Sequence, residues 1–347
     1  MSENRVIGSE HIEDARQRGR LIFEILPGDI VTSLARETAH RLGIELITGP
    51  IEKPTLARTD GKTSMGRSLY RRSPKWIAPE KGISSRAKRF SKISIVGAGG
   101  VGANISHLAA NLDLSNEIAI VDIVPGLAAA TALDLNHASG ITRSSTKIVG
   151  SETLDLISGS DVVIVTAGRA RSPGMTRSDL ININKRVIQS TAEVIKNQSP
   201  SAIVIVITNP LDEMTMEMLT ATGFPRERVL GMAGTLDSSR FRRSLAMAAG
   251  VKTADVEAIT LGSHGDEMAP IISHSKIKGR SLERFLSTEE IEACSKDAIS
   301  GGGQVVALKK MGSATIAPAH ASIEILNHIR GAKNGSIPVS VMLEGEF

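Results

Sequence analysis

"KISIVGAGGVG", residues 92 to 102, decides the fold. Its first five residues form a short apolar, β-branched run that is typical of a buried strand. Gly97, Gly99 and Gly102 follow in a G-x-G-x-x-G frame, and apolar residues then recur at helical spacing: Val101, Ile105, Leu108, Ala109 and Leu112. The first glycine permits a tight turn, the second lets the backbone approach a pyrophosphate, and the third allows close helix packing. The stretch therefore predicts a strand, a phosphate-binding turn and a helix.

A carboxylate at the end of the next strand completes this pattern. The apolar run EIAIV, residues 117–121, leads directly into Asp122, twenty residues beyond Gly102. An acid at this distance accepts hydrogen bonds from the ribose hydroxyls of a dinucleotide and repels a 2′-phosphate, so NAD is preferred to NADP. The predicted cofactor-binding residues of this region are Gly97, Ala98, Gly99, Gly100, Val101, Gly102 and Asp122.

Short apolar runs alternate with helical segments throughout this part of the chain. The runs occupy residues 92–96, 117–121, 161–166 and 202–208 and are rich in Ile and Val. Nearly continuous apolar strands are typical of a parallel sheet that is buried on both faces. The predicted fold class is α/β, an open doubly wound parallel (Rossmann) sheet. No internal repeat at a fixed period is expected.

The positive charge is concentrated in one segment. Residues 58–92 contain eleven Lys and Arg against two acidic residues, a balance of +9. Since the whole chain has a net charge of +4, the rest of it carries about −5. The segment is rich in Ser, Gly and Pro and lacks a periodic apolar pattern, which favours a solvated, flexible linker. Tyr70 and Trp76 among these charges leave nucleic-acid binding as the alternative.

Residues 29–48 predict one short amphipathic helix followed by a strand-like run. Its apolar stripe is Val31, Leu34, Ala35, Thr38, Ala39 and Leu42. Thr32 or Ser33 can cap the start of the helix, and Gly43 can close its end. A helix of about three turns is marginal alone in water, so the stripe must pack on this protein's own body or in a partner's groove.

The remaining composition is that of an ordinary globular protein. The N-terminus lacks an apolar signal region, and no apolar run approaches the roughly 20 residues of a membrane span, so a cytoplasmic location is expected. The single cysteine, Cys294, excludes an intramolecular disulfide and a cysteine-only metal site. No metal site is expected.

Three residues suggest acid–base chemistry. His264 lies between glycines in LGSHGDEMAP, and Asp237 and Arg240 lie one helical turn apart in GTLDSSRFRRSL. Imidazole has the pKa range needed to take a hydroxyl proton during hydride transfer, and a carboxylate on its other nitrogen would orient the ring. A structural role for a lone histidine is the alternative.

These stretches together resemble the lactate/malate dehydrogenase family, and most closely its malate dehydrogenases of the lactate-dehydrogenase-like type. The resemblance runs from about Arg89 to the last residue through GAGGVG, VDIVPG, ALDLNHAS, TAGRARSPGMTR, ITNPLD, GMAGTLDSSRF, LGSHGD and GSATIAP. It implies NAD-dependent, reversible oxidation of (S)-malate to oxaloacetate. The alternatives are an L-lactate or other 2-hydroxyacid dehydrogenase, and an NAD-binding protein with little or no activity.

The resemblance also implies roles for individual residues. His264 matches the proton acceptor, Asp237 its partner carboxylate, and Arg240 the arginine that binds the substrate carboxylate. Arg177 matches the loop arginine that polarises the carbonyl group. Arg171 matches the specificity position, where an arginine pairs with the second carboxylate of a four-carbon diacid.

Further positions follow from the same motifs. Asn209 matches a residue that binds substrate and cofactor, Ile207 and Thr208 lie beside the nicotinamide, and Asn184 contacts the cofactor. The loop from Gly168 to about Ser178 would be a lid that brings its arginines to the substrate on closing. Arg169 has no matching role and is expected to be a solvated charge.

Four regions are predicted: an N-terminal helical extension (1–57), a basic linker (58–90), a Rossmann domain (91–232) and an α+β substrate domain (233–347). Family members normally continue several tens of residues beyond the point that matches LEGEF, so the last domain is expected to be shortened. The family also forms homo-oligomers, dimers or tetramers. Residues 29–48 resemble terminal targeting segments of bacterial microcompartment enzymes, which makes a shell or core protein a candidate partner.

Overall fold

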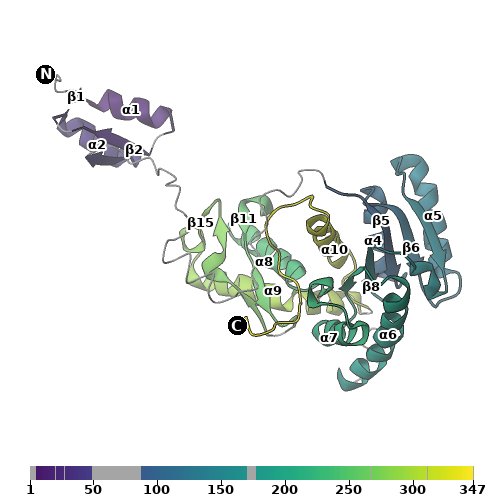
Figure 1. Ribbon diagram of the computed structural model, residues 1–347. Helices are drawn as coiled ribbons and strands as arrows, with labels where there is room; N and C mark the ends of the chain where they lie inside the picture. Colours follow the sequence, from purple (N-terminus) through teal and green to yellow (C-terminus); the bar gives the residue numbers. More distant parts are fainter. Residues whose placement is uncertain are drawn as a thin grey trace. The chain divides into compact units, whose positions relative to one another are not determined.

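The computed structural model describes residues 5–19, 21–26, 28–48, 87–169, 177–265, 267–310 and 312–346 (Figure 1). The chain forms two compact units, Met1–Ile77 and Ala78–Phe347. Most of the predicted basic linker lies outside the described residues, as do Tyr70, Trp76 and Arg171. No helix of the described residues is long and apolar enough to cross a membrane.

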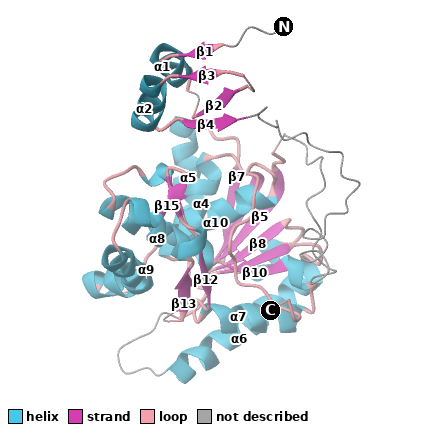
Figure 2. Cartoon of the chain, turned by 90° about the vertical axis from the view of Figure 1, so that its left-hand side faces the viewer, coloured by secondary structure: helices cyan, strands magenta, loops and turns pink. Residues whose placement is uncertain are grey.

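The N-terminal unit is a small α/β structure. Its elements in chain order are β1 (Val6–Ile7), α1 (Ser9–Gln17), β2 (Ile22–Ile25), β3 (Ile30–Val31), α2 (Ser33–Leu42) and β4 (Glu45–Thr48). Strand β1 pairs in parallel with β3, and β2 with β4, while both helices lie on one side of the strands (Figure 2). The sequence analysis predicted only α2 and the strand-like run after it, and missed α1 and strands β1, β2 and β3. Two-residue strands are too short to give an alternating pattern, and α1 buries only Ile12 and Ala15.

The predicted helix within residues 29–48 is confirmed. The Thr32 hydroxyl accepts a hydrogen bond from the Ala35 N–H at 3.2 Å, and Gly43 ends the helix in a left-handed conformation with φ 65°. Ala35, Thr38 and Ala39 are buried inside the N-terminal unit itself. The sequence left open whether the stripe packs on this protein's own body or in a partner's groove. These three residues of the stripe pack on the protein's own body.

The unit consists of two β-α-β halves in succession, β1-α1-β2 and β3-α2-β4. Val6 pairs with Ile30 in the parallel register, an offset of 24 residues. The same offset relates the buried alanines Ala15 and Ala39, and the two positive-φ glycines that follow the helices, Gly19 and Gly43. Strand β2 pairs with β4 at an offset of 23 residues, Ile22 with Glu45, so the offset between the two halves is not constant.

The second unit begins with an all-parallel sheet, as predicted, and it has six strands, of which the sequence analysis identified four. Its strand order is β10-β9-β8-β5-β6-β7, which is the doubly wound order of a Rossmann domain. The strands are β5 (Phe90–Val96), β6 (Ser115–Val121), β7 (Lys147–Ser151), β8 (Val162–Val165), β9 (Ile203–Val206) and β10 (Val229–Gly231). The order reverses between β5 and β8, where a crevice opens at the carboxyl ends of the strands.

Helices cover both faces of this sheet. Helices α4 (Gly100–Asn111) and α5 (Leu127–Thr142) share one apolar core with α10 (Ile316–Ile329), a helix from the end of the chain. Helices α6 (Arg177–Gln198) and α7 (Leu211–Thr222) form the core of the opposite face. The nearly continuous apolar strands predicted two covered faces, and the structure confirms them.

The remaining helices and strands form an α+β part with its own core. They are α8 (Gly234–Ala248), α9 (Thr288–Lys309) and the short strands β11 (Val256–Glu257), β12 (Thr260–Gly262), β13 (Met268–Pro270), β14 (Lys276–Ile277) and β15 (Arg280–Ser281). Strands β11, β14 and β15 form one antiparallel sheet, and β12 and β13 form a hairpin. Phe241 of α8 is fully buried in this core.

Candidate active site

Two glycines of the turn between β5 and α4, Gly97 and Gly102, have no room for a side chain. A Cβ on Gly102 would lie 1.8 Å from the Gly97 carbonyl oxygen, and a Cβ on Gly97, at φ 107°, would lie 2.5 Å from Thr166 Oγ1. The turn therefore packs closely on the strand ends, and α4 begins directly after it at Gly100. The first N–H groups of a helix have no partner within the helix. This cradle fits the pyrophosphate of a dinucleotide.

Asp122, at the end of β6, is held beside the turn. Its carboxylate accepts hydrogen bonds from the Ala98 N–H at 2.6 Å and from the Val124 N–H at 2.9 Å. These bonds orient the side chain and tie the glycine turn to the second strand. Each carboxylate oxygen keeps a lone pair for a further donor, such as a ribose hydroxyl.

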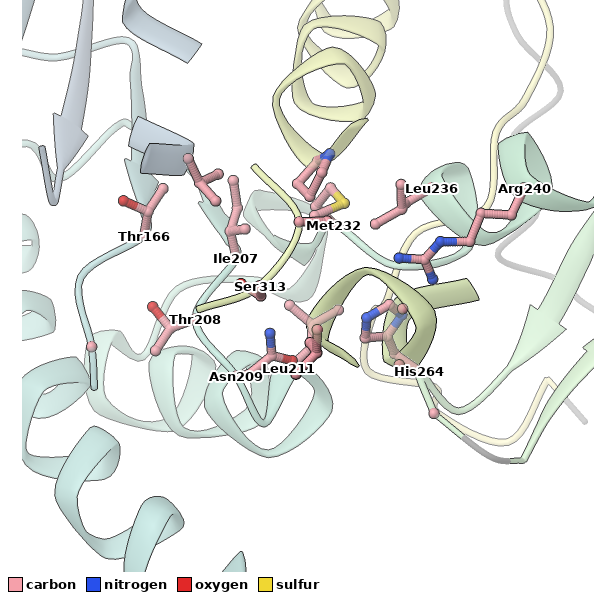
Figure 3. Close-up of a pocket in the computed structure, with 18 of the residues that line it drawn as sticks. Thr166, Ile207, Thr208, Asn209, Leu211, Met232, Leu236, Arg240, His264 and Ser313 are labelled. Atoms are coloured by element: carbon pink, nitrogen blue, oxygen red, sulfur yellow. The ribbon is translucent and has the colours of Figure 1, made fainter. Parts of the chain in front are cut away.

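A cavity of about 380 Å³ lies next to this crevice. Figure 3 shows Thr166 and Thr208 at one end of it, and Arg240 and His264 at the other. Among the predicted site residues, it brings together Val101, Ile207, Thr208, Asn209, Arg240 and His264. Lining residues that the sequence analysis missed include Met232, Leu236, Ile299, Gly302, Val306, Ser313 and Pro318. They are apolar or small, so no chemical pattern marked them in the sequence.

His264 and Asp237 form a hydrogen-bonded pair. The distance from His264 Nδ1 to Asp237 Oδ2 is 2.8 Å, and the Asp237 side chain is only 2% exposed. An ionised carboxylate only accepts, so Nδ1 donates and Nε2 is left for a substrate proton. Arg240, one turn further along α8, donates from Nη1 to Asp237 Oδ1 at 2.9 Å. The buried carboxylate thus holds both the imidazole and the guanidinium at the cavity wall.

Arg240 lies against a glycine run in the middle of α9. A Cβ on Gly301 would lie 3.2 Å from Arg240 Cδ, and one on Gly302 would lie 3.5 Å from Nη2. Each glycine in a helix interior costs about 1 kcal/mol relative to alanine. The close approach of the Arg240 side chain is a physical reason for tolerating that cost here.

Asp212, near the start of α7, holds the backbone of His264. Its carboxylate accepts from the His264 N–H at 2.9 Å, from Ser263 Oγ at 3.0 Å and from Ser340 Oγ at 2.6 Å. Partial burial raises the pKa of Asp212, but these three hydrogen bonds outweigh it and hold the pKa below its ordinary value. Asp212 was not among the predicted site residues, although the motif ITNPLD contains it.

Asn184 lies behind the wall of the cavity and is fully buried. Its Oδ1 accepts a hydrogen bond from the Arg169 N–H at 2.7 Å. Its Nδ2 donates to the carbonyl oxygens of Arg169 at 3.1 Å and Asn209 at 2.6 Å. These contacts position two cavity residues, while the cofactor contact expected of Asn184 stays a prediction. Arg169 is exposed and also lines the cavity, so its charge is next to the site.

Two predicted residues fall where the structure describes no side chain. Arg171 lies outside the described residues, together with the rest of 170–176. Arg177 begins α6, and only its backbone is described. The predicted lid and its arginines therefore stay predictions. Among the described residues, no group of three His, Cys, Asp or Glu side chains is placed to hold a metal ion.

Comparison with known proteins shows which family the chain belongs to. A model described as the lactate/malate dehydrogenase NAD binding domain matches residues 91–231, and one described as the lactate/malate dehydrogenase alpha/beta C-terminal domain matches residues 234–347. The chain belongs to the lactate/malate dehydrogenase family. It is an NAD-dependent dehydrogenase, and the prediction of NAD as its cofactor is confirmed.

Individual members of the lactate/malate dehydrogenase family match most of the chain. Malate dehydrogenase 1 of Anaeromyxobacter dehalogenans is 42% identical over 258 residues, which cover 74% of this chain and 82% of the relative. The structure of Cryptosporidium parvum malate dehydrogenase aligns with a TM-score of 0.71 at 41% identity and covers 74% of this chain and 83% of that one. The lactate dehydrogenase of the same organism, complexed with lactic acid and NAD, has a TM-score of 0.70 at 35% identity, with coverage of 74% and 82%.

Proposed function

We propose that the enzyme oxidises (S)-malate to oxaloacetate, reversibly, with a His264–Asp237 pair as the acid–base group. The observation that carries the proposal is the 2.8 Å contact between these two side chains at the wall of the cavity. Relatives named malate dehydrogenase at about 40% identity support the substrate. Lactate or another 2-hydroxy acid is the alternative.

The chain's own residues account for the proton and for substrate orientation. His264 Nε2 takes the hydroxyl proton of malate, and Asp237 stabilises the imidazolium that forms. Arg240 binds the carboxylate next to the reacting carbon through two parallel N–H donors. Bound NAD⁺ supplies the hydride acceptor, and the glycine cradle and Asp122 would hold it. In the reverse direction His264 returns the proton to the oxygen of oxaloacetate.

Arg171 and Arg177 have the remaining proposed roles. Arg177 stabilises negative charge on the reacting oxygen, and Arg171 pairs with the second carboxylate of the diacid. Pyruvate has a methyl group in place of the CH2–COO⁻ group of oxaloacetate, so it lacks the second carboxylate and would leave Arg171 unpaired. The proposal therefore predicts a preference for oxaloacetate over pyruvate.

The test is NADH oxidation by the full-length protein with oxaloacetate and pyruvate in parallel. Arg171→Gln should lower the oxaloacetate-to-pyruvate ratio of kcat/KM by about 10-fold or more, because a charge-assisted hydrogen bond is worth about 1.5–3 kcal/mol. Arg186→Gln, on the exposed side of α6, makes the same chemical change away from the cavity and should leave the ratio unchanged. An unchanged ratio in Arg171→Gln would refute the substrate assignment. NADH binding without turnover on either acid would favour a binding-only protein.

We further propose that the N-terminal unit docks on a shell or core protein of a bacterial microcompartment, within the cytoplasm. The resemblance of residues 29–48 to targeting segments supports this function, but Ala35, Thr38 and Ala39 of the α2 stripe are buried, and only Leu34 of the stripe is largely exposed, at 59%. The strand face opposite the helices is available instead: Val6 is 55%, Ile22 38% and Ile30 56% exposed. Apolar strand side chains on that face fit an apolar surface of a partner.

Fluorescence microscopy of the full-length chain, tagged at its C-terminus and expressed beside a compartment operon, tests the docking proposal. The wild type should form compartment foci and Ile30→Asp should be diffuse, whereas Arg36→Asp on the exposed side of α2 should keep the foci. Diffuse wild-type fluorescence would contradict the proposal.

We also propose that the enzyme is a homo-oligomer, a dimer or a tetramer, as its family resemblance implies. Sedimentation velocity at micromolar concentration measures the state, and a monomer at all concentrations would refute this.

A further inference from the structure

The C-terminal segment, residues 337–343, contacts three elements next to the acid–base site: β10, α8 and α7. Its Ser340 exchanges two backbone hydrogen bonds with Gly231 of β10, at 2.8 and 2.9 Å. The Pro338 carbonyl accepts from Thr235 Oγ1 of α8 at 2.7 Å. Ser340 Oγ donates to Asp212 of α7 at 2.6 Å. The segment is therefore fixed to the sheet edge and to the helix that carries Asp237.

The approach of this segment to the sheet is close. A Cβ on Gly231 would lie 3.0 Å from Ser340 Cβ and 2.5 Å from Thr215 Oγ1, so only glycine fits at this point of β10. The backbone bridge fixes the position of Ser340, and its hydroxyl then reaches the Asp212 carboxylate.

Asp212 links Ser340 to the catalytic histidine. Its Oδ1 accepts from Ser340, and its Oδ2 accepts from Ser263 Oγ and the His264 N–H. A carboxylate with donors on both oxygens has little rotational freedom, and hydrogen bonds to a charged acceptor are roughly twice as strong as neutral ones. His264 is thus held at two points: its ring by Asp237 and its backbone by Asp212.

We infer that Asp212 and Ser340 are positioning residues that set the place of His264 for proton transfer. The inference rests on the proposed role of His264 as the acid–base group. An acidic residue in the first turn of a helix also stabilises the helix dipole. That role alone would need neither Ser340 nor the His264 N–H, so the two explanations predict different results.

Ser340→Ala removes the hydroxyl and keeps the backbone bridge to Gly231. It should lower kcat for oxaloacetate reduction about tenfold, because small displacements of a catalytic group are costly, while the Kd for NADH stays within about twofold. The matched control is Ser336→Ala, an exposed serine of the same part of the chain, which should behave as the wild type. Equal kcat values for the two variants would overturn the inference.

A second readout does not depend on turnover. Amide hydrogen exchange of a peptide covering residues 260–268 should be faster in Ser340→Ala than in Ser336→Ala, since the His264 N–H loses a fixed acceptor. Exchange that is the same in both variants would also overturn the inference. If the wild type shows no turnover with either acid, the proposed function fails, and the exchange experiment still tests the positioning.

Substitutions at Asp212 separate hydrogen bonding from charge. Asp212→Asn keeps an acceptor oxygen for the His264 N–H, so it should retain several-fold more activity than Asp212→Ala. Equal losses in the two variants would contradict positioning through hydrogen bonds. Asp212→Ala combined with Ser340→Ala should be no slower than Asp212→Ala alone, because both remove the same link.

Discussion

Asp237→Asn removes the charge of the site carboxylate and preserves its shape. In the structure this carboxylate is 2.8 Å from His264 Nδ1 and 2.9 Å from Arg240 Nη1. Two unit charges about 4 Å apart attract by about 4 kcal/mol at an effective dielectric constant of about 20. After proton transfer, the imidazolium of the variant would face a neutral amide and the Arg240 cation.

The exposure of the His264 and Arg240 side chains to water limits how much activity the Asp237→Asn substitution should cost. The side chains of His264 and Arg240 are 17% and 20% exposed, so water screens part of the interaction. We therefore expect a loss of about 2–4 kcal/mol in the transition state, or a decrease in kcat of about 30- to 1,000-fold. The amide can also donate to Nδ1 and favour the wrong tautomer, which acts in the same direction.

The assay is oxaloacetate-dependent NADH oxidation at saturating NADH, with urea unfolding and NADH titration of the same preparations. Asp134→Asn, on the exposed side of α5, provides the same chemical change away from the site and should keep wild-type kcat. A folded Asp237→Asn enzyme with kcat within about threefold of the wild type would refute the role of the carboxylate.

Three further substitutions test other parts of the structure. Gly102→Ala should abolish measurable NADH binding in a fluorescence titration, because its Cβ would lie 1.8 Å from a carbonyl oxygen. The control Gly140→Ala adds a Cβ where there is open space, so this variant should bind NADH normally. Normal NADH binding by both variants would contradict the proposed role of the glycine turn. Gly301→Ala should raise the KM for oxaloacetate about 3- to 10-fold without changing the Kd for NADH, since its Cβ would lie 3.2 Å from Arg240 Cδ and displace that side chain. An unchanged KM would show that Gly301 is not needed to position Arg240. A hydrogen bond from Arg226 lowers the pKa of Glu346 from 4.5 to about 2. Its stabilising effect is therefore present above about pH 4.5 and lost as the pH falls toward 2, and the difference in unfolding midpoint between wild type and Glu346→Gln should vanish over that range; a difference independent of pH would rule out the ion pair.

The Rossmann half could be predicted in some detail because its signals are local. The run ending at Val96 and the glycines after it show both the strand and the turn, and each lies within a few residues of the sequence. Strands β7 and β10 were missed, because KIVGS and VLG are short and contain glycine. The N-terminal unit was also only partly predicted, since its short strands become stable only when the two β-α-β halves pair with each other.

The sequence by itself determined the fold class, the glycine turn with Asp122, and the residue types of the acid–base site. Such features depend on the period of apolar residues and on motifs of a few positions. The family resemblance also implied that His264 and Asp237 are partners, but only the tertiary structure showed which other side chains hold the site together. Asp212 and Ser340 are 128 positions apart, and no local pattern relates them. Their contact exists because the C-terminal segment pairs with β10 at the point where α7 and the His264 loop also converge. Long-range packing of the chain, rather than local propensity, places the groups that hold His264.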